Sequence, residues 1–341
     1  MTLRLKELLD AVKPAKTAIG DAQFIAIAIP TFSNHFVGWN NASEPCLLIK
    51  TTDSGFLAPL KLSALEVQFC VPCEIVLPND RRERYQLTVV TCTSADGDLR
   101  NYFLHLMGTV IEIVGAQPTL HGVSDAIGKL VEILQHLSKP ASRNVAGLYA
   151  ELLVIAVSQN PIKCVAAWRA NPTDRFDFAL DDARLETKAT SDRIRSHYFA
   201  LEQCVPPVGT YAVIASMFVE QSGAGQSLEE LLGEVQKRLS GDMQALLKLR
   251  TVVANSLGAS LPGSLPVRFD SALARSTIVF FKVEDIPAIR PPVPSGVSAI
   301  RFRSDLTGVP LAAAEDVAKE CASLVHLLPL STQASGVLGE N

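Results

Sequence analysis

The stretch that decides the fold is Arg175-Phe-Asp-Phe-Ala-Leu-Asp-Asp-Ala-Arg-Leu-Glu-Thr-Lys-Ala-Thr190. Apolar residues alternate with other residues on each side of Asp181-Asp182, and successive side chains of a strand point to opposite faces. The pattern therefore predicts a β-hairpin. It puts Asp177 on the first strand and places Glu186 and Lys188 together on one face of the second.

The loop of this hairpin determines which side chains meet across the two strands. With Asp181-Asp182 as a two-residue loop, Leu180 pairs with Ala183, and Asp177 falls opposite Glu186. Directly opposed residues have Cβ atoms about 5 Å apart. Two carboxylates that close raise one another's pKa, whereas a divalent cation between them removes the repulsion. The predicted site depends on this register. Asp-Asp is not one of the favoured hairpin loops, so the loop alone does not fix the register.

A third acid lies in the apolar segment from Val145 to Val157, which predicts a helix. Glu151 is the one charged residue of this segment. It either faces the hairpin or is simply exposed on the edge of the helix. Three carboxylates supply the hard oxygen ligands that Mg²⁺ prefers, and a bound metal can polarise a phosphoryl oxygen and activate a water. Lys188 can hold that water and stabilise developing negative charge.

A basic stretch follows the hairpin between Ser191 and Cys204. It carries Arg193, Arg195, His197 and Gln203. One interpretation is a DNA-binding edge that positions a phosphate beside the scissile bond. The alternative for the basic residues is a solvated loop, and the alternative for the glutamine is a position on a helix surface or a role in shaping the site.

The composition sets the limits for these interpretations. The chain has 341 residues, enough for about two domains, with 48% hydrophobic and 19% charged residues. The formal net charge is −4, so no overall basic field attracts nucleic acid. Contact with DNA would have to depend on a local basic patch or on a partner protein.

The seven cysteines are odd in number and irregular in spacing, which does not indicate a disulfide framework. The first residues form no apolar signal core, and no apolar run approaches the roughly 20 residues of a membrane span. The sequence predicts a soluble cytoplasmic protein with reduced thiols and no membrane contact.

Periodicity and turn residues predict the remaining elements. Before the hairpin, strands are predicted at 24–29, 46–50, 65–71, 74–77 and 85–93, and helices at 98–114 and 124–137. After it, the predictions are a buried central strand at 211–219, a helix from 228 to about 257 that is interrupted at Gly241, strands at 276–283 and 297–303, and a helix at 312–328.

Asp177 followed by Glu186-x-Lys188 resembles the PD-(D/E)xK signature of restriction-endonuclease-like nucleases, although Phe176 stands in place of its proline. The core of that superfamily runs helix, three strands, helix, strand, which resembles the order predicted from Val145 to about Leu257. Residues from roughly 140 to 310 are similar to a prokaryotic group of uncharacterised PD-(D/E)xK proteins found in phage-defence neighbourhoods. The shared features are Gly147-Leu-Tyr-Ala-Glu151-Leu-Leu, Phe176-Asp-Phe178, Leu185-Glu-Thr-Lys-Ala-Thr190, Arg195-Ser-His197, Leu201-Glu-Gln203 and Pro294-Ser-Gly-Val297.

The resemblance implies an α/β restriction-endonuclease-like core with a mixed sheet flanked by helices, at residues 139–310. A mainly β module at 1–138 would serve recognition or oligomerisation, and 311–341 would be a C-terminal helix and tail. It also implies a Mg²⁺-dependent DNA endonuclease of a restriction or phage-defence system, with Mn²⁺ as a possible substitute. Glu151, Asp177 and Glu186 would be metal ligands, and Lys188 would be the catalytic lysine.

Two alternatives to the nuclease remain open. In the first, the nuclease fold is kept but catalysis is weak or lost, and the protein binds DNA or other subunits of a defence complex. A second copy of the chain, in a homodimer, is a further candidate partner. In the second, the hairpin is ordinary surface and the protein is a scaffold. The net charge gives both alternatives weight, because an autonomous DNA-binding protein is usually more basic.

Overall fold

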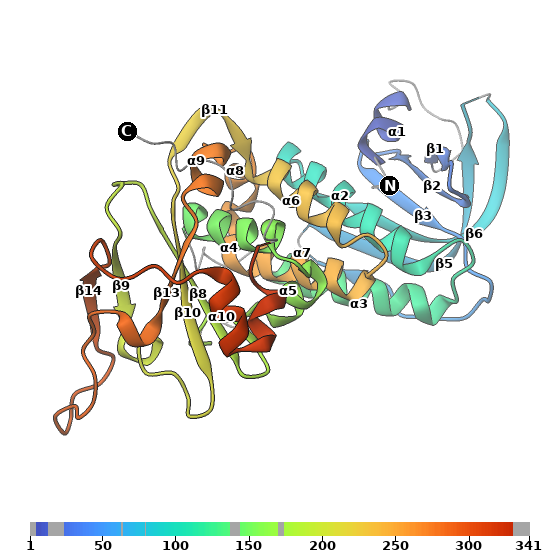
Figure 1. The fold of residues 1–341 in the computed structure, drawn as a ribbon. Helices are drawn as coiled ribbons and strands as arrows, with labels where there is room; N and C mark the ends of the chain where they lie inside the picture. The colour runs from blue at the N-terminus through green and yellow to red at the C-terminus, as the bar shows by residue number, and fades with distance from the viewer. Residues whose placement is uncertain are drawn as a thin grey trace. The chain divides into compact units, whose positions relative to one another are not determined.

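The computed structural model describes residues 5–12, 24–62, 64–78, 80–136, 144–169 and 174–329. The chain divides into two compact units, Met1–Gln135 and His136–Asn341 (Figure 1). The domain boundary predicted between residues 138 and 139 lies outside the described residues, and the boundary predicted at residue 310 stays a prediction.

The first unit is built on a six-stranded sheet with the order β1-β2-β3-β6-β5-β4. Strand β1 also pairs with β5 in parallel, so five of these strands form a closed ring. Apolar side chains of the ring, among them Phe36, Leu48 and Ile75, pack in one buried cluster. The elements of this unit are α1 (Leu5–Ala11), β1 (Phe24–Ile29), β2 (Phe32–Asn40), β3 (Pro45–Ile49), β4 (Leu60–Lys61), β5 (Leu65–Val76), β6 (Arg82–Cys92), α2 (Gly97–Val114) and α3 (Leu120–His136).

Most of the predicted elements of this unit are confirmed, with two corrections. The strands predicted at 65–71 and 74–77 are one strand, β5, whose register shifts between Gln68 and Val71. Strand β2 was not predicted, because polar residues interrupt its apolar pattern. Its Gly38 lies so close to β1 that a Cβ would stand 2.1 Å from the carbonyl oxygen of Ile25, so only glycine fits there.

The second unit contains a four-stranded sheet with the order β13-β10-β8-β7. Strands β8 and β10 are parallel, and the other two pairs are antiparallel, so the sheet is mixed. The predicted central strand at 211–219 is confirmed as β10, which lies between two neighbours and is buried along most of its length. The sheet strands are β7 (Phe178–Leu180), β8 (Ala183–Thr190), β10 (Tyr211–Phe218) and β13 (Val279–Lys282).

Two smaller strand pairs accompany this sheet. Strand β9 (Ser196–Ala200), followed by the short 3-10 helix η1 (Leu201–Gln203), pairs with β14 (Arg301–Asp305). Strand β11 (Gln221–Ser227) pairs with β12 (Arg268–Phe269). The strand predicted at 297–303 is thus shorter and begins later than expected.

Helices pack around the mixed sheet. The predicted helix at 145–157 is confirmed as α4 (Val145–Val157), which packs against β8 and α6 (Leu228–Arg238). The predicted interruption at Gly241 is confirmed as well, since its φ of 97° separates α6 from α7 (Met243–Leu257). A short helix that was not predicted, α5 (Pro161–Ala167), begins where Asn160 caps it. Other helices are α8 (Leu261–Ser264), α9 (Ser271–Ser276) and α10 (Ala314–Glu320), with the 3-10 segments η2 (Gly258–Ser260), η3 (Val283–Asp285) and η4 (Ala322–His326).

The helix predicted at 312–328 is wrong as a single element. Cys321 has extended backbone angles and divides it into α10 and η4. The helices α4, α6 and α7 and the strands of the four-stranded sheet nevertheless follow one another in the order α4, β7, β8, β10, α6 with α7, and β13, with the other elements inserted between them. This is the predicted order of helix, three strands, helix and strand, and it confirms the mixed α/β fold class.

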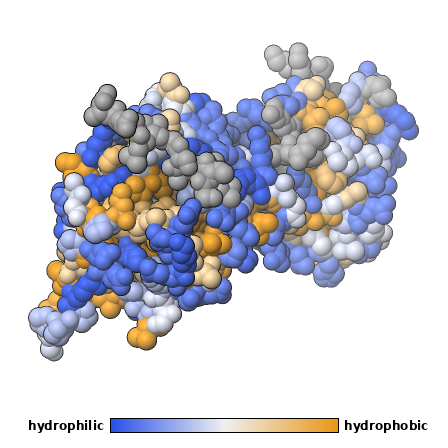
Figure 2. Space-filling view, viewed as in Figure 1, coloured by the Kyte–Doolittle hydropathy of each residue, from blue (hydrophilic) through white to orange (hydrophobic). Residues whose placement is uncertain are grey.

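Figure 2 shows the hydropathy of one face of the molecule. Hydrophilic residues predominate on the visible face, with smaller hydrophobic areas between them (Figure 2). Within the described part of the chain, none of the helices is both long and apolar enough to cross a membrane. The seven cysteines are free of disulfides.

Helix α6, which packs on α4, begins with a capping box. The Ser227 hydroxyl accepts from the Glu230 N–H at 3.0 Å, and the Glu230 carboxylate accepts from the Ser227 N–H at 2.8 Å. We expect Ser227→Ala to lower the free energy of unfolding by about 1 kcal/mol in urea denaturation, since the cap is lost. Glu230→Gln keeps an acceptor for the second bond and should cost less. A Ser227→Ala variant as stable as the wild type would contradict this assignment.

Candidate active site

The hairpin has the register that its two-residue loop predicts. Leu180 pairs with Ala183, and Phe178 pairs with Leu185. Asp181 in the loop has a φ of 47°, a conformation that aspartate tolerates in turns. Continued one residue beyond β7, this register sets Asp177 against Glu186, and the Asp177 Oδ2 accepts a hydrogen bond of 2.8 Å from the Thr187 N–H.

Glu151 is buried on α4, so the alternative of an exposed helix-edge glutamate is wrong. Its Oε2 accepts a 2.6 Å hydrogen bond from the indole N–H of Trp168, and its Oε1 lies 3.6 Å from the Arg169 Nη2. Trp168 follows α5 and pairs with Phe178 through an isolated bridge. The chain after α5 therefore runs beside β7 and brings α4 and the hairpin to one place.

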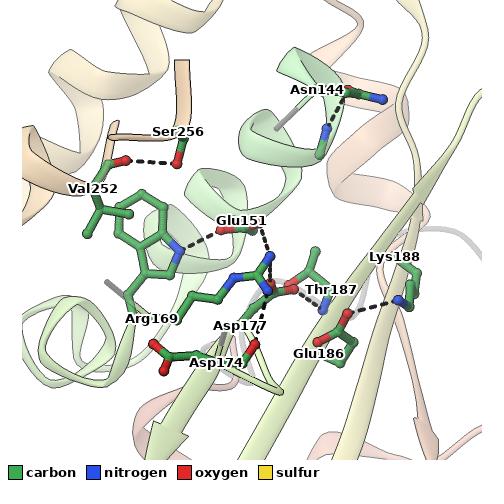
Figure 3. Close-up of polar contacts among 12 residues, drawn as sticks. Asn144, Glu151, Arg169, Asp174, Asp177, Glu186, Thr187, Lys188, Val252 and Ser256 are labelled. Atoms are coloured by element: carbon green, nitrogen blue, oxygen red, sulfur yellow. Dashed lines mark hydrogen bonds and ion pairs between the residues drawn. The ribbon is translucent and has the colours of Figure 1, made fainter. Parts of the chain in front are cut away.

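Arg169 links the acid on the helix with the acid on the hairpin (Figure 3). Its Nη2 lies 2.8 Å from the Asp177 Oδ1, and its backbone N–H donates to the Asp177 carbonyl at 2.8 Å. Burial lowers the pKa of Arg169, but the charges of Asp177, Glu151 and Glu186 together hold that pKa above its ordinary value. The guanidinium is therefore the counter-charge of this acidic cluster.

Lys188, Glu186 and Gln203 form the other half of the site. The Lys188 ammonium donates to the Glu186 Oε1 at 2.8 Å and to the Gln203 Oε1 at 3.1 Å, and it lies 4.9 Å from the centre of the Phe199 ring. The Gln203 amide donates to the same Glu186 oxygen at 2.6 Å. Gln203 therefore hydrogen-bonds to both Lys188 and Glu186, and it is not a glutamine on an exposed helix surface. It shapes the site by holding the acid beside the lysine.

Glu186 is buried, and one of its carboxylate oxygens lacks a hydrogen bond from any described residue. Its Oε2 is buried and has no hydrogen-bond partner among the described residues. Burial and the charge of Asp177 raise the pKa of Glu186 to about 7, while Lys188 and Arg169 oppose this shift. A buried carboxylate oxygen without a partner is costly, and a hard cation such as Mg²⁺ would satisfy it.

The cluster as it stands is not arranged around a metal ion. Over the described ranges, no group of three or more His, Cys, Asp or Glu side chains is placed so that it could hold one. The chemistry of the acids fits a divalent cation, but Arg169 already lies between Glu151 and Asp177 (Figure 3).

The basic residues after the hairpin have different surroundings. Arg193 is exposed and forms an ion pair of 2.5 Å with Glu220. The half-buried Arg195 donates to the carbonyl and hydroxyl oxygens of Ser216, each at 2.8 Å, and to the Thr277 carbonyl at 2.7 Å. His197 is buried, with its Nε2 2.9 Å from the same Ser216 hydroxyl.

The solvated-loop alternative is therefore wrong for Arg195 and His197, both of which are tied to Ser216 of β10. In this conformation their polar atoms support β10 and do not form an open surface. Direct contact of Arg193, Arg195, His197 and Gln203 with DNA stays a prediction.

The sequence patterns did not single out Trp168 and Arg169. The signal present was an aromatic and a basic residue directly after the largely apolar α5, a few residues before the hairpin segment. Neither residue belongs to the alternating pattern, and only the bridge to Phe178 brings them to the acids.

Helix α4, the hairpin with its two acids and lysine, β10, the α6–α7 layer and β13 together define a PD-(D/E)xK-like fold. The chain belongs to the family described as "Putative PD-(D/E)XK family member, (DUF4420)", whose model matches residues 8–307. Because the match begins at residue 8, the first unit belongs to the family pattern together with the second. No curated protein and no solved structure matched the chain.

The burial of His197 predicts a loss of stability in acid. Burial, together with the charges of Lys188, Arg195 and Arg303, lowers the pKa of His197 from 6.5 to about 4. Between pH 6.5 and 4 this histidine is protonated in the unfolded chain but stays neutral in the folded chain. The free energy of unfolding therefore falls as the pH drops through this range. At about 1.4 kcal/mol per pH unit, this histidine accounts for up to about 3 kcal/mol.

His197→Gln removes the titrating group and keeps an amide for Ser216. Urea denaturation of both proteins at several pH values from 7 to 4 should show a smaller acid-induced loss in the variant. The difference between them at pH 7 reports the packing change alone. If both proteins lost stability in parallel down to pH 4, the buried neutral state of His197 would be refuted.

Proposed function

We propose that this chain is a nuclease that hydrolyses DNA phosphodiester bonds with a divalent metal ion, Mg²⁺ or Mn²⁺. The observation that supports the proposal is the placement of Asp177, Glu186 and Lys188 on one hairpin, with Glu151 joined to them through Arg169. Burying three carboxylates is costly unless they are paired or bind a cation. Such a cluster is therefore typical of a functional site.

Glu151, Asp177 and Glu186 would hold the metal. When bound, the ion would polarise a phosphoryl oxygen and lower the pKa of a water molecule. Lys188 would orient that water and stabilise the charge that develops on the phosphate, because its ammonium is held next to Glu186. Trp168 and Gln203 would fix two of the carboxylates through hydrogen bonds to Glu151 and Glu186.

DNA as the substrate is inferred from membership of a PD-(D/E)XK family. The net charge of −4 means that DNA contact must depend on a local surface or on other subunits. We assign recognition or oligomerisation to the first unit, and a role in a restriction or phage-defence system in the cytoplasm to the whole chain. The role in restriction or phage defence rests on the resemblance of residues 140 to 310 to that group of proteins.

Cleavage assays test the proposed activity directly. We expect purified protein to nick or cut DNA in Mg²⁺ or Mn²⁺, and we expect Asp177→Asn or Lys188→Met to reduce the rate by at least about 100-fold, since each removes a group that acts on the reacting phosphate. Asp285→Asn and Lys237→Met change exposed residues of the same types elsewhere and should cut like the wild type. Cleavage that survives both site variants would rule out this active site.

A second candidate function is a nuclease-fold subunit that binds DNA or a partner protein without cutting. The arrangement of Arg169 favours it, because the guanidinium pairs with two of the acids that would otherwise bind metal. Calorimetric titration of the metal-free protein with Mn²⁺ separates the two candidates.

A catalytic site predicts Mn²⁺ binding that Glu186→Gln weakens by at least about tenfold, or 1.4 kcal/mol. Gln keeps the size of the side chain and removes the charge that a cation requires. The same lack of binding in the wild type and in this variant would favour the non-catalytic subunit.

A further inference from the structure

We propose that Arg169 is a built-in counter-cation of the acidic cluster, which divalent metal must displace from between Asp177 and Glu151. This inference rests on the proposed function, because it assigns a role toward the metal of that same site. It adds a residue outside the PD-(D/E)xK signature to the group that sets metal affinity.

The geometry places the guanidinium where the two acids meet. The Arg169 Nη2 is 2.8 Å from the Asp177 Oδ1 and 3.6 Å from the Glu151 Oε1. The remaining oxygens of these acids are taken, since Asp177 Oδ2 accepts from the Thr187 N–H and Glu151 Oε2 accepts from the Trp168 indole. The Asp177 Oδ1 and the Glu151 Oε1 are the oxygens that face Arg169.

The contact is held by charge more than by hydrogen bonds. Although the Asp177 Oδ1 lies 2.8 Å from the guanidinium, neither this oxygen nor the buried Arg169 Nε has a well-aligned hydrogen-bond partner among the described residues. A guanidinium that served mainly as a structural brace would use its donors in a fork against the carboxylate. Arg169 instead neutralises two acids that would otherwise repel each other.

The side chain can leave without moving the backbone. The Arg169 backbone N–H is fixed by its bond to the Asp177 carbonyl, and Trp168 anchors the preceding position. The arginine side chain is 19% exposed, against 3% for Asp177 and 6% for Glu151, so it is the member of the cluster that reaches solvent. Displacement then costs the ion pairs of Arg169 and the 3.4 Å hydrogen bond from its Nη1 to the Asp174 carbonyl, and this cost lowers the apparent affinity for metal.

Removing the charge should therefore strengthen metal binding. We expect Arg169→Met, which keeps an unbranched side chain, to bind Mn²⁺ at least about tenfold more tightly than the wild type in calorimetric titration of the full chain. Arg169→Lys keeps a positive charge and should lie closer to the wild type. Arg268→Met removes an exposed arginine paired with Glu230 and should leave the Mn²⁺ affinity unchanged.

Thermal unfolding provides a second readout that a merely structural arginine would not move in this way. Without metal, Arg169→Met should unfold at a lower temperature than the wild type, because its buried acids lack their counter-charge. With saturating Mn²⁺ the unfolding temperature of the variant should rise by more than that of the wild type. Both measurements are independent of DNA cleavage.

The outcomes separate this inference from the proposed function. If the wild type binds Mn²⁺ and Asp177→Asn does not, while Arg169→Met binds no more tightly, the metal site stands and the role of Arg169 is refuted. If neither the wild type nor Arg169→Met binds Mn²⁺, both the metal site and the role of Arg169 are overturned. If Arg169→Met binds Mn²⁺ more tightly than the wild type and its unfolding temperature rises more on adding Mn²⁺, both the metal site and the role of Arg169 are supported.

Discussion

The site depends on the pairing of two short strands around the Asp181-Asp182 loop. Because Leu180 pairs with Ala183, Asp177 and Glu186 stand opposite each other, and the Thr187 N–H holds the Asp177 carboxylate. A shift of one residue would send Asp177 to the other face, away from Glu186. The burial of β8 between β7 and β10 fixes this register, since a slipped strand would expose its apolar residues.

Given that register, electrostatics decides what the cluster can be. The charges of three buried acids are balanced by Arg169 and Lys188, and the surroundings of these two cations differ. Lys188 is held by Gln203 and lies over the Phe199 ring, so it is fixed where it could act on a substrate. Arg169 lacks well-aligned hydrogen bonds to the acids and is the cation that could be exchanged. Under the role proposed for Arg169, the site combines a permanent positive charge, Lys188, with one that a metal ion replaces, Arg169.

The sequence predicted much of this because the signals were local. Period-two alternation placed Asp177, Glu186 and Lys188, and a lone acid in an apolar helix marked Glu151. Trp168 and Arg169 were missed because only tertiary packing brings the end of α5 to the hairpin. The burial of Arg195 and His197 depends likewise on Ser216 of a distant strand, so no local pattern could distinguish these residues from a solvated loop.

We propose that the carboxylates of this hairpin and of α4 form a divalent-metal site. Anomalous diffraction from crystals soaked in Mn²⁺ tests it most directly. We expect a manganese peak within bonding distance of Asp177 and Glu186, with the Arg169 guanidinium moved away from Asp177. A well-ordered site without such a peak, in which Arg169 keeps its ion pairs at saturating Mn²⁺, would contradict the account.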